Sequence, residues 1–340
     1  MTSFISGATG FIGSLLMRRL LQEGHRVVAL VRSESMHKTT EEHENLWWVE
    51  GDLLDADSVK QAMEGCDRVF HAAAYASVWA PDDQLFYDVN LTGTKNVLKA
   101  AVEHDVGRLV FTSTAATLAP ADPDQPSDET CRNQDLTNPY AHSKFLAEDK
   151  VRACNESDGL QTVIVHPTRV FGPGPLTESN AVTRIFKFYL EGKWRFQIGD
   201  GSYFGNYCYV RDLVEGHLLA MEHGRPGEHY ILGGSNLSFH ELFELMAEAA
   251  DLQRTKIPLP EPVMRGFARF EQFRADTFNA RPLITPKWID KYLKNWALSN
   301  DKAKRDLGYK ITPASEAIKK TMKWLQAPSS RLHGYTSWHS

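Results

Sequence analysis

Residues 7–13 read Gly-Ala-Thr-Gly-Phe-Ile-Gly, and this segment constrains the fold more than any other part of the chain. It follows a short apolar run and precedes apolar residues at helical spacing. A glycine-rich turn between a first strand and a first helix lets the backbone approach a bound pyrophosphate, and the helix N-terminus offers N–H groups to the anion. The spacing departs from the common Gly-x-Gly-x-x-Gly fingerprint, and such turns also occur without a ligand. The strand–turn–helix context favours a nucleotide site.

Short β-rich segments alternate with longer helical patterns over the first half of the chain, which is typical of a parallel sheet with crossover helices. The pattern predicts strands at 3–6, 26–31, 46–49, 68–70, 108–112 and 161–165, and helices at 11–23, 57–63, 83–102 and 139–154. We therefore expect an α/β fold with a Rossmann-like, doubly wound parallel sheet, whose ligands bind outside the carboxyl ends of the strands.

The regular alternation ends at 172–175, Gly-Pro-Gly-Pro. Beyond it the pattern predicts helices at 182–191, 212–222 and 239–250, and strands at 207–209 and 228–232. We expect a dinucleotide-binding domain of residues 1–173, to which 207–233 return. A smaller, mostly helical substrate domain would comprise 174–206 and 234–325, followed by a tail, 326–340.

Tyr140 and Lys144 are four residues apart within a predicted helix, so their side chains share one face, with about 5–6 Å between Cβ atoms. A phenol keeps its proton up to a pH of about 10, and a nearby ammonium group stabilises the phenolate and lowers this pKa. The pair is suited to proton transfer at a carbonyl or alcohol oxygen. Alone, the spacing also fits an ordinary surface pair. Together with the glycine turn, it favours a catalytic pair.

The two motifs together resemble the extended short-chain dehydrogenase/reductase family, within the NAD-dependent epimerase/dehydratase superfamily, over roughly residues 1–325. The chain looks most like the dihydroflavonol-reductase-like branch. Further landmarks of the family follow in order: Gly51-Asp52-Leu53, the segment 69–74, Asn90, the segment 111–114 and the segment 167–173. The combination is specific for the family and much less so for a substrate.

The resemblance implies a dinucleotide that lies across the strand ends. Asp52 would hold the adenine, and small alanines after the fourth strand would let the backbone approach the cofactor. The residues expected to bind it are Gly7, Thr9, Gly10, Phe11, Ile12, Arg32, Lys38, Asp52, Leu53, Ala72, Ala73, Ala74, Thr112, Tyr140, Lys144, Pro167 and Val170.

The end of the second strand bears on the choice between NADP(H) and NAD(H). An NAD site usually places a carboxylate there for the ribose 2′-hydroxyl. This chain has Val31 and then Arg32, and an arginine fork suits a 2′-phosphate. A solvated arginine at a strand end is the alternative. The sequence favours NADP(H).

The resemblance also implies the catalytic roles. Tyr140 would donate a proton to the substrate oxygen, Lys144 would lower the pKa of Tyr140 and bind the nicotinamide ribose, and Thr114 would polarise the carbonyl. Ser113 is the alternative for the hydroxyl. Alcohol oxidation would use the same residues in reverse.

The expected substrate is a ketone or aldehyde of a small or lipid-like apolar molecule. Sugar-nucleotide members of the family usually carry a diphosphate-binding asparagine where we place Val170, and an arginine where this chain has Gly205. Arg169, Arg184 or Arg211 could replace that charge. A nucleotide-sugar epimerase or dehydratase with tightly bound NAD(P), and a non-catalytic NADP(H)-binding sensor, therefore stay open.

Composition bears on which partners the protein can bind and on where in the cell it is expected. The net charge of −5 gives no basic field for nucleic acid, and no apolar run approaches the roughly 18 residues of a membrane span. The first predicted strand begins within three residues of Met1, which leaves no room for a signal peptide, and the four cysteines form no Cys-x-x-Cys pair. The histidines show no metal-ligand spacing. We expect a cytoplasmic protein without a metal, and a homodimer through the helices at 83–102 and 139–154.

We predict that NADPH binds more tightly than NADH because Arg32 meets the 2′-phosphate. Arg32→Ala should remove most of this preference. Dissociation constants for both cofactors measure it, and equal constants in the unaltered protein would contradict the assignment.

Overall fold

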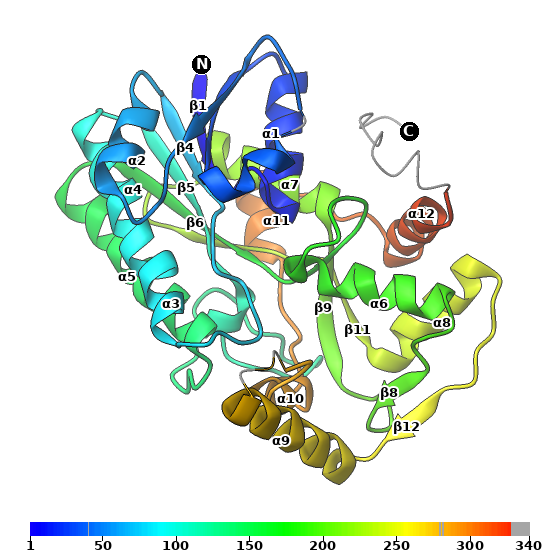
Figure 1. Cartoon of the computed structure of the whole chain (residues 1–340). Coiled ribbons are helices and arrows are strands. Elements are labelled where there is room, and N and C mark those ends of the chain that lie inside the picture. Colours follow the sequence, from blue (N-terminus) through cyan, green and yellow to red (C-terminus); the bar gives the residue numbers. More distant parts are fainter. Residues whose placement is uncertain (40, 279, 281, 328–340) are drawn as a thin grey trace.

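A seven-stranded parallel sheet forms the centre of the computed structural model, which describes residues 1–327 except 40, 279 and 281 (Figure 1). Its strand order is β10-β6-β5-β4-β1-β2-β3. The strands are β1 (Thr2–Ser6), β2 (Arg26–Val31), β3 (Leu46–Glu50), β4 (Arg68–His71), β5 (Arg108–Thr112), β6 (Gln161–Pro167) and β10 (His229–Leu232). The order reverses beside β1, so the predicted Rossmann-like, doubly wound sheet is confirmed, and its ligand crevice is expected at the carboxyl ends of β1 and β4.

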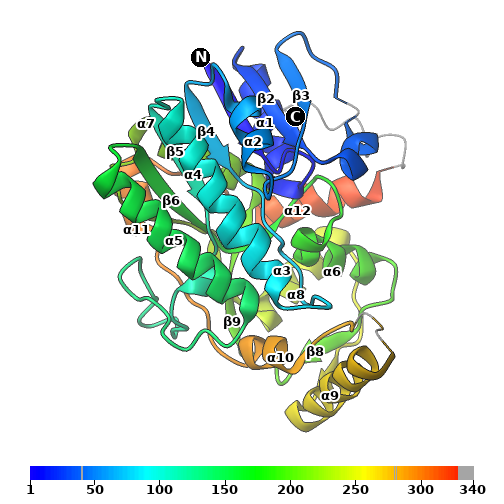
Figure 2. The same cartoon turned by 60° about the vertical axis from the view of Figure 1, so that its left-hand side comes forward.

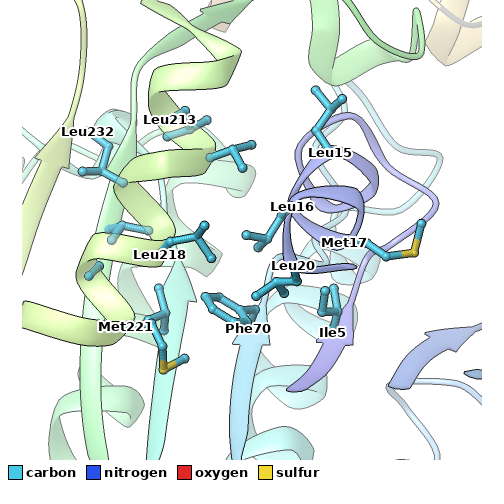
Figure 3. Close-up of a cluster of buried hydrophobic side chains, with 14 of the residues drawn as sticks. Ile5, Leu15, Leu16, Met17, Leu20, Phe70, Leu213, Leu218, Met221 and Leu232 are labelled. Atoms are coloured by element: carbon cyan, nitrogen blue, oxygen red, sulfur yellow. The ribbon is translucent and has the colours of Figure 1, made fainter. Parts of the chain in front are cut away.

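Helices cover both faces of this sheet. One face packs against α1 (Phe11–Gln22), α7 (Val210–His223) and α11 (Asp301–Leu307), and the other against α2 (Ala56–Met63), α4 (Gly93–Glu103) and α5 (Pro139–Ser157). Figure 3 shows Leu16 and Leu20 of α1 meeting Leu218 of α7 and Phe70 of β4. These buried apolar stripes fix the distance of the helices from the sheet, and with it the position of every loop at the strand ends.

The predicted helix at 83–102 is one helical run with a defect. It begins as α3 (Gln84–Tyr87), passes through a π-helical turn at Asp88–Thr92 and continues as α4. Among the apolar positions on which the dimer prediction rests, Val97 is buried in the chain's own core, whereas Leu85, Val89, Phe145 and Leu146 are partly buried. The homodimer stays a prediction.

A second, three-stranded sheet has the order β11-β9-β7, with β7 (Arg169–Phe171), β9 (Phe204–Tyr209) and β11 (Ser235–Ser238). The expected return of 207–209 to the main sheet was wrong, because β9 is paired with β7 on one side and β11 on the other. The expected strand at 228–232 does return, as β10 beside β6. The chain leaves the main sheet directly after Pro167 and forms β7. Because β9 pairs with β7, β9 also lies outside the main sheet.

The remaining elements gather at one end of the molecule (Figures 1 and 2). They are α6 (Ala181–Leu190), β8 (Phe196–Ile198), α8 (Phe239–Ala250), β12 (Ile257–Leu259), α9 (Glu261–Phe278), α10 (Pro286–Tyr292) and α12 (Ala314–Gln326). A capping box begins α8: the Ser238 hydroxyl accepts from the Glu241 N–H, and the Glu241 carboxylate accepts from the Ser238 N–H. Residues 328–340 of the expected tail lie outside the described residues.

The turn between β1 and α1 depends on glycine at two positions. Gly7 has φ +82°, in the left-handed region that disfavours side chains. A Cβ atom at Gly13 would overlap the carbonyl oxygen of Gly7. The first turn of α1 therefore lies directly on the backbone of the preceding turn.

We predict that Gly13→Ala lowers the free energy of unfolding by more than about 2 kcal/mol, because rigid backbone cannot yield to the new methyl group. Gly266→Ala is the matched control: Gly266 lies in α9 with open space around it, so alanine should be neutral or stabilise by up to about 1 kcal/mol. Urea unfolding of both variants measures the difference, and equal effects would contradict the packing argument.

Candidate active site

The glycine turn lies against the end of β4. A Cβ atom at Gly7 would come within 2.7 Å of the Ala73 nitrogen and 2.9 Å of the Ala72 carbonyl carbon. The N-cap of α1 is Gly10, with no capping side chain and no acid in the first helical turn. The positive end of the helix is thus open to an anion, beside the small residues Ala72 and Ala73 at the end of β4. Phe11 is buried, and Thr9 and Ile12 are partly buried at this turn.

A buried chain of hydrogen bonds joins the ends of β1 and β4 to α5. The Ser6 hydroxyl lies 2.6 Å from His71 Nδ1, and His71 Nε2 lies 3.0 Å from the Thr94 hydroxyl. Thr94 donates to the Asn90 carbonyl at 2.6 Å, and Asn90 Nδ2 donates to the Ser143 hydroxyl at 2.9 Å. Asn90 sits in the π-helical turn. The sequence indicated Asn90 only as a family landmark; its role as an anchor between β4 and α5 was missed.

Local sequence places Tyr140 in the first turn of α5. Asn138 is the N-cap, and its side chain accepts from the Tyr140 N–H at 2.9 Å and from the Ala141 N–H at 3.4 Å. Pro139 follows at the first helical position, where its missing N–H costs nothing. Tyr140, Lys144 and Glu148 then follow one another at successive helical turns, with Lys144 and Glu148 buried.

The end of β5 separates three hydroxyl groups. Thr112 contacts His217 Nε2 at 3.0 Å, on the α7 side of the sheet, and Ser113 donates to the buried Glu148 carboxylate. The Thr114 side chain caps the short turn that follows and also hydrogen-bonds Tyr140. The geometry therefore brings together Thr114 and Tyr140, and it leaves the Ser113 and Thr112 hydroxyls directed elsewhere.

Burial raises the pKa of the Tyr140 phenol to about 12, and the hydrogen bond with Thr114 opposes this rise. In the ligand-free chain the loss of water around the phenol dominates this pKa, and the predicted lowering by Lys144 stays a prediction. At neutral pH the phenol is protonated. It is in the form that can donate a proton to an oxygen.

Lys144 is fully buried, and its Nζ atom has no hydrogen-bond partner among the described residues. The ammonium lies 3.9 Å from the centre of the Phe111 ring. Burial lowers the pKa of Lys144 to about 7, against the opposing pull of Glu148. A buried ammonium without hydrogen bonds lowers the free energy of unfolding. Polar groups of a ligand could supply the hydrogen bonds that the described residues do not.

Behind Lys144, Glu148 meets two histidines from different strands. Glu148, His166 and His229 bring potential metal-ligand atoms within 4.8 Å of one another. His166 Nε2 lies 3.0 Å from His229 Nδ1, while Glu148 accepts from Ser113 and from Thr117. Sequence spacing missed this cluster because its members come from α5, β6 and β10. Hydrogen bonds among its own members and these hydroxyls account for the arrangement.

The expected adenosine contacts lie at the ends of β2 and β3. Arg32 is exposed and pairs with Glu34 at 2.8 Å, an acid that the sequence argument overlooked. One carboxylate oxygen of Asp52 accepts from the Leu54 N–H at 2.8 Å, and Leu53 is partly buried beside Gly93. The backbone of Lys38 lies in a 3-10 turn, Ser33–Lys38, and its side chain lies outside what the structure describes.

The remaining two expected contacts lie where the chain leaves the main sheet. Pro167 ends β6, while Val170 is buried in β7, in the apolar core shared with α1 and α7. Its side chain is part of the packing between the two sheets.

A cavity of about 70 Å³ opens beside Tyr140. Leu136, Asn138 and Tyr140 line one side, and Trp288, Lys291 and Trp296 of the C-terminal region line the other. The indole N–H of Trp288 donates to the Val78 carbonyl at 3.2 Å, which ties α10 to the loop after β4. No local sequence pattern marks these C-terminal residues as part of the site.

The match to a family model now agrees with this geometry. Residues 3–233 match the NAD-dependent epimerase/dehydratase family. The chain belongs to this family. It is an extended short-chain dehydrogenase/reductase, as the motifs indicated. No helix in the described part of the chain is long and apolar enough to cross a membrane.

Relatives cover nearly the whole chain. It is 30% identical to a putative dihydroflavonol 4-reductase of Synechocystis over 98% of this chain and 95% of that protein. It is 30% identical to a 2-alkyl-3-oxoalkanoate reductase of Stenotrophomonas maltophilia over 91% of this chain and 94% of that one. A solved UDP-glucose 4-epimerase of Thermus thermophilus, in complex with NAD, has a TM-score of 0.75 and 26% identity over 96% of this chain and 99% of the other.

The described residues fit a dinucleotide of the kind that this family binds. The N-terminus of α1 has no capping side chain, and the Lys144 ammonium lacks a partner among the described residues. These are two separate features, from α1 and α5, that a bound dinucleotide would satisfy together.

We predict that Lys144→Met stabilises the ligand-free protein at neutral and lower pH by roughly 2–4 kcal/mol, because it removes a desolvated charge. The pKa of Lys144 is about 7 in the folded chain and near 10.5 in the unfolded chain, so the unfolded chain binds more protons between these values. Stability of the unaltered protein must therefore rise with pH through this window, and the gain from Lys144→Met must shrink.

Urea unfolding at about pH 6 and about pH 9.5 measures this change. Lys150→Met, at an exposed lysine of the same helix, is the control and should show no such pH dependence. A Lys144→Met gain that is equal at both pH values would contradict the assignment.

Proposed function

We propose that the protein is an NADPH-dependent reductase that converts a ketone or aldehyde of a small or lipid-like apolar molecule to the alcohol, or catalyses the reverse. The observation that carries this proposal is the arrangement of Thr114, Tyr140 and Lys144. A protonated phenol is hydrogen-bonded to a threonine hydroxyl, faces a cavity and lies one helical turn from an unsatisfied ammonium. These groups are suited to general acid–base catalysis at a carbonyl oxygen.

In this proposal Thr114 and Tyr140 hold the substrate oxygen with two hydroxyl groups, and Tyr140 gives it a proton as negative charge develops. Bound NADPH supplies the hydride for the carbonyl carbon. Lys144 would bind the ribose of the cofactor, gain polar partners and become fully charged, and this charge would favour the phenolate left after proton transfer. Glu148, which accepts a hydrogen bond from Ser113, stabilises the charged form of Lys144, and neither Ser113 nor Glu148 takes part in the proton transfer.

The preference for NADP(H) rests on Arg32. Its ion pair with Glu34 is exposed, so the pair contributes little and exchange of Glu34 for a phosphate costs little. The main chain around Gly7 and Ala72–Ala74 would hold the pyrophosphate and the nicotinamide ribose without discriminating between the two cofactors.

A nucleotide-sugar epimerase is the second candidate, and one observation favours it. The space above Gly205, where sugar-nucleotide members usually carry an arginine, is occupied by the guanidinium group of Arg169. The charge is thus restored from a neighbouring strand. Against this candidate, Val170 is packed in the core, and the two relatives described above bear the names of reductases. An intact Tyr140–Lys144 pair argues against a non-catalytic sensor.

The test is a panel of apolar ketones and aldehydes with NADPH absorbance as the readout, run beside UDP-, GDP- and dTDP-sugars analysed by chromatography. We expect NADPH consumption with the carbonyl panel. Tyr140→Phe should abolish turnover and leave NADPH affinity nearly unchanged, because only the proton donor is removed. Epimerised sugar without net NADPH consumption would overturn the proposal. Tyr140→Phe activity within about tenfold of the unaltered protein, or about 1.4 kcal/mol, would exclude Tyr140 as the donor.

A further inference from the structure

Arg169 of β7 and Lys291 of α10 are cationic side chains that have no carboxylate partner among the described residues. Arg169 begins β7, and its guanidinium carbon lies 5.4 Å from the ring centres of Tyr207 and Phe239 and 5.5 Å from that of Tyr292. Its Nη1 donates to the Tyr207 hydroxyl at 3.0 Å, whereas its buried Nη2 has no hydrogen-bond partner among the described residues. Half of the guanidinium fork is therefore unused.

Lys291 of α10 lines the cavity beside Tyr140 and is close enough to Arg169 to feel its charge. Its Nζ lies 4.8 Å from the centre of the Trp288 ring and 5.3 Å from that of Trp296, and all three residues line the cavity. Gly205, over which the Arg169 guanidinium lies, pairs with Trp296 in a short bridge. Arg169 thus adjoins the wall of the cavity that contains Tyr140.

The local charge is uncompensated within the described part of the chain. Neither Arg169 nor Lys291 has a carboxylate oxygen within 4 Å there. The acids of the cavity wall are exposed, and Asp290 is held by Arg265 at 2.5 Å. Burial and the charge of Arg169 lower the pKa of Lys291 to about 7. The two cations repel one another, and this repulsion is relieved when Lys291 loses its proton or when an anion binds between them.

We infer that Arg169 and Lys291 form a subsite for an anionic group of the substrate, and that this group is a carboxylate on the carbonyl compound that Tyr140 protonates. The inference rests on the proposed reductase function. A planar guanidinium fork with one free arm matches a carboxylate, and the aromatic walls accept the hydrocarbon part that links it to the carbonyl. The substrate class is then an oxo-carboxylic acid with an apolar chain.

The first test compares an oxo-carboxylate of the active carbonyl series with its methyl ester. We expect the unaltered protein to favour the acid by about tenfold or more in kcat/KM, in the range of one charge-assisted hydrogen bond. Arg169→Met should remove this preference, mainly through KM, and leave the rate with the ester within about threefold. Lys291→Met should remove part of it. Arg269→Met, at an exposed arginine of α9, is the matched control and should change the rate with neither substrate.

The second test separates the subsite from catalysis. Calorimetric titration of the cofactor-free protein with octanoate and with UDP needs no turnover, and unchanged NADPH affinity shows that each variant is folded. We expect octanoate binding that Arg169→Met weakens about tenfold or more.

Four outcomes decide the matter. Arg169-dependent octanoate binding without turnover of any carbonyl compound supports the subsite and overturns the reductase function. Equal kcat/KM for acid and ester in the unaltered protein overturns the subsite and leaves the reductase function intact. Arg169-dependent binding of UDP, with none of octanoate, assigns the charge to a nucleotide and overturns the carboxylate. Loss of acid and ester activity to the same degree in Arg169→Met makes Arg169 structural and also overturns it.

Discussion

The close backbone contact between the turn after β1 and the end of β4 sets the geometry on which the site depends. Gly7 and Gly13 allow the chain to fold onto itself and onto Ala72–Ala73 without a side chain in between. The hydrogen-bond chain from Ser6 through Asn90 to Ser143 carries this position across to α5. The helix N-terminus that would face a pyrophosphate and the helix that presents Tyr140 are therefore held in one frame.

Desolvation is the second constraint, and it acts against the stability of the chain. Burial keeps Tyr140 protonated, with a pKa of about 12, and holds Lys144 near the middle of its titration, with a pKa of about 7. Neither group would be tuned in this way on an open surface, where water would support the charged forms. Sites of this kind trade folding free energy for reactivity, because ligand binding supplies the partners that the folded chain withholds.

The departure of the chain from the main sheet after Pro167 determines what the cavity can accept. It creates β7, draws β9 and β11 into a separate sheet, and thereby places Arg169 above Gly205 among aromatic rings. The C-terminal helices complete the wall, with Trp288 and Lys291 from α10. The second sheet and the C-terminal helices thus form one wall of the cavity, while α5, which packs on the doubly wound sheet, places Tyr140 at the other.

The sequence by itself determined the features that depend on neighbours in the chain. Asn138-Pro139 starts α5 at the residue that puts Tyr140 in its first turn, Ser238 and Glu241 cap α8, and the glycine spacing and strand–helix alternation predict the doubly wound sheet. Short-range hydrogen bonds and side-chain periodicity specify these elements, so a local pattern suffices.

Only the tertiary structure decided the rest. The direction of the Ser113 hydroxyl toward Glu148 depends on α5, and the raised pKa of Tyr140 follows from the loss of water around the phenol. The sheet that β9 joins, and the replacement of a missing charge at Gly205 by Arg169, depend on strands far apart in the chain. Burial, electrostatics and strand pairing sum over residues that only folding brings together, and no local pattern of residues encodes that sum.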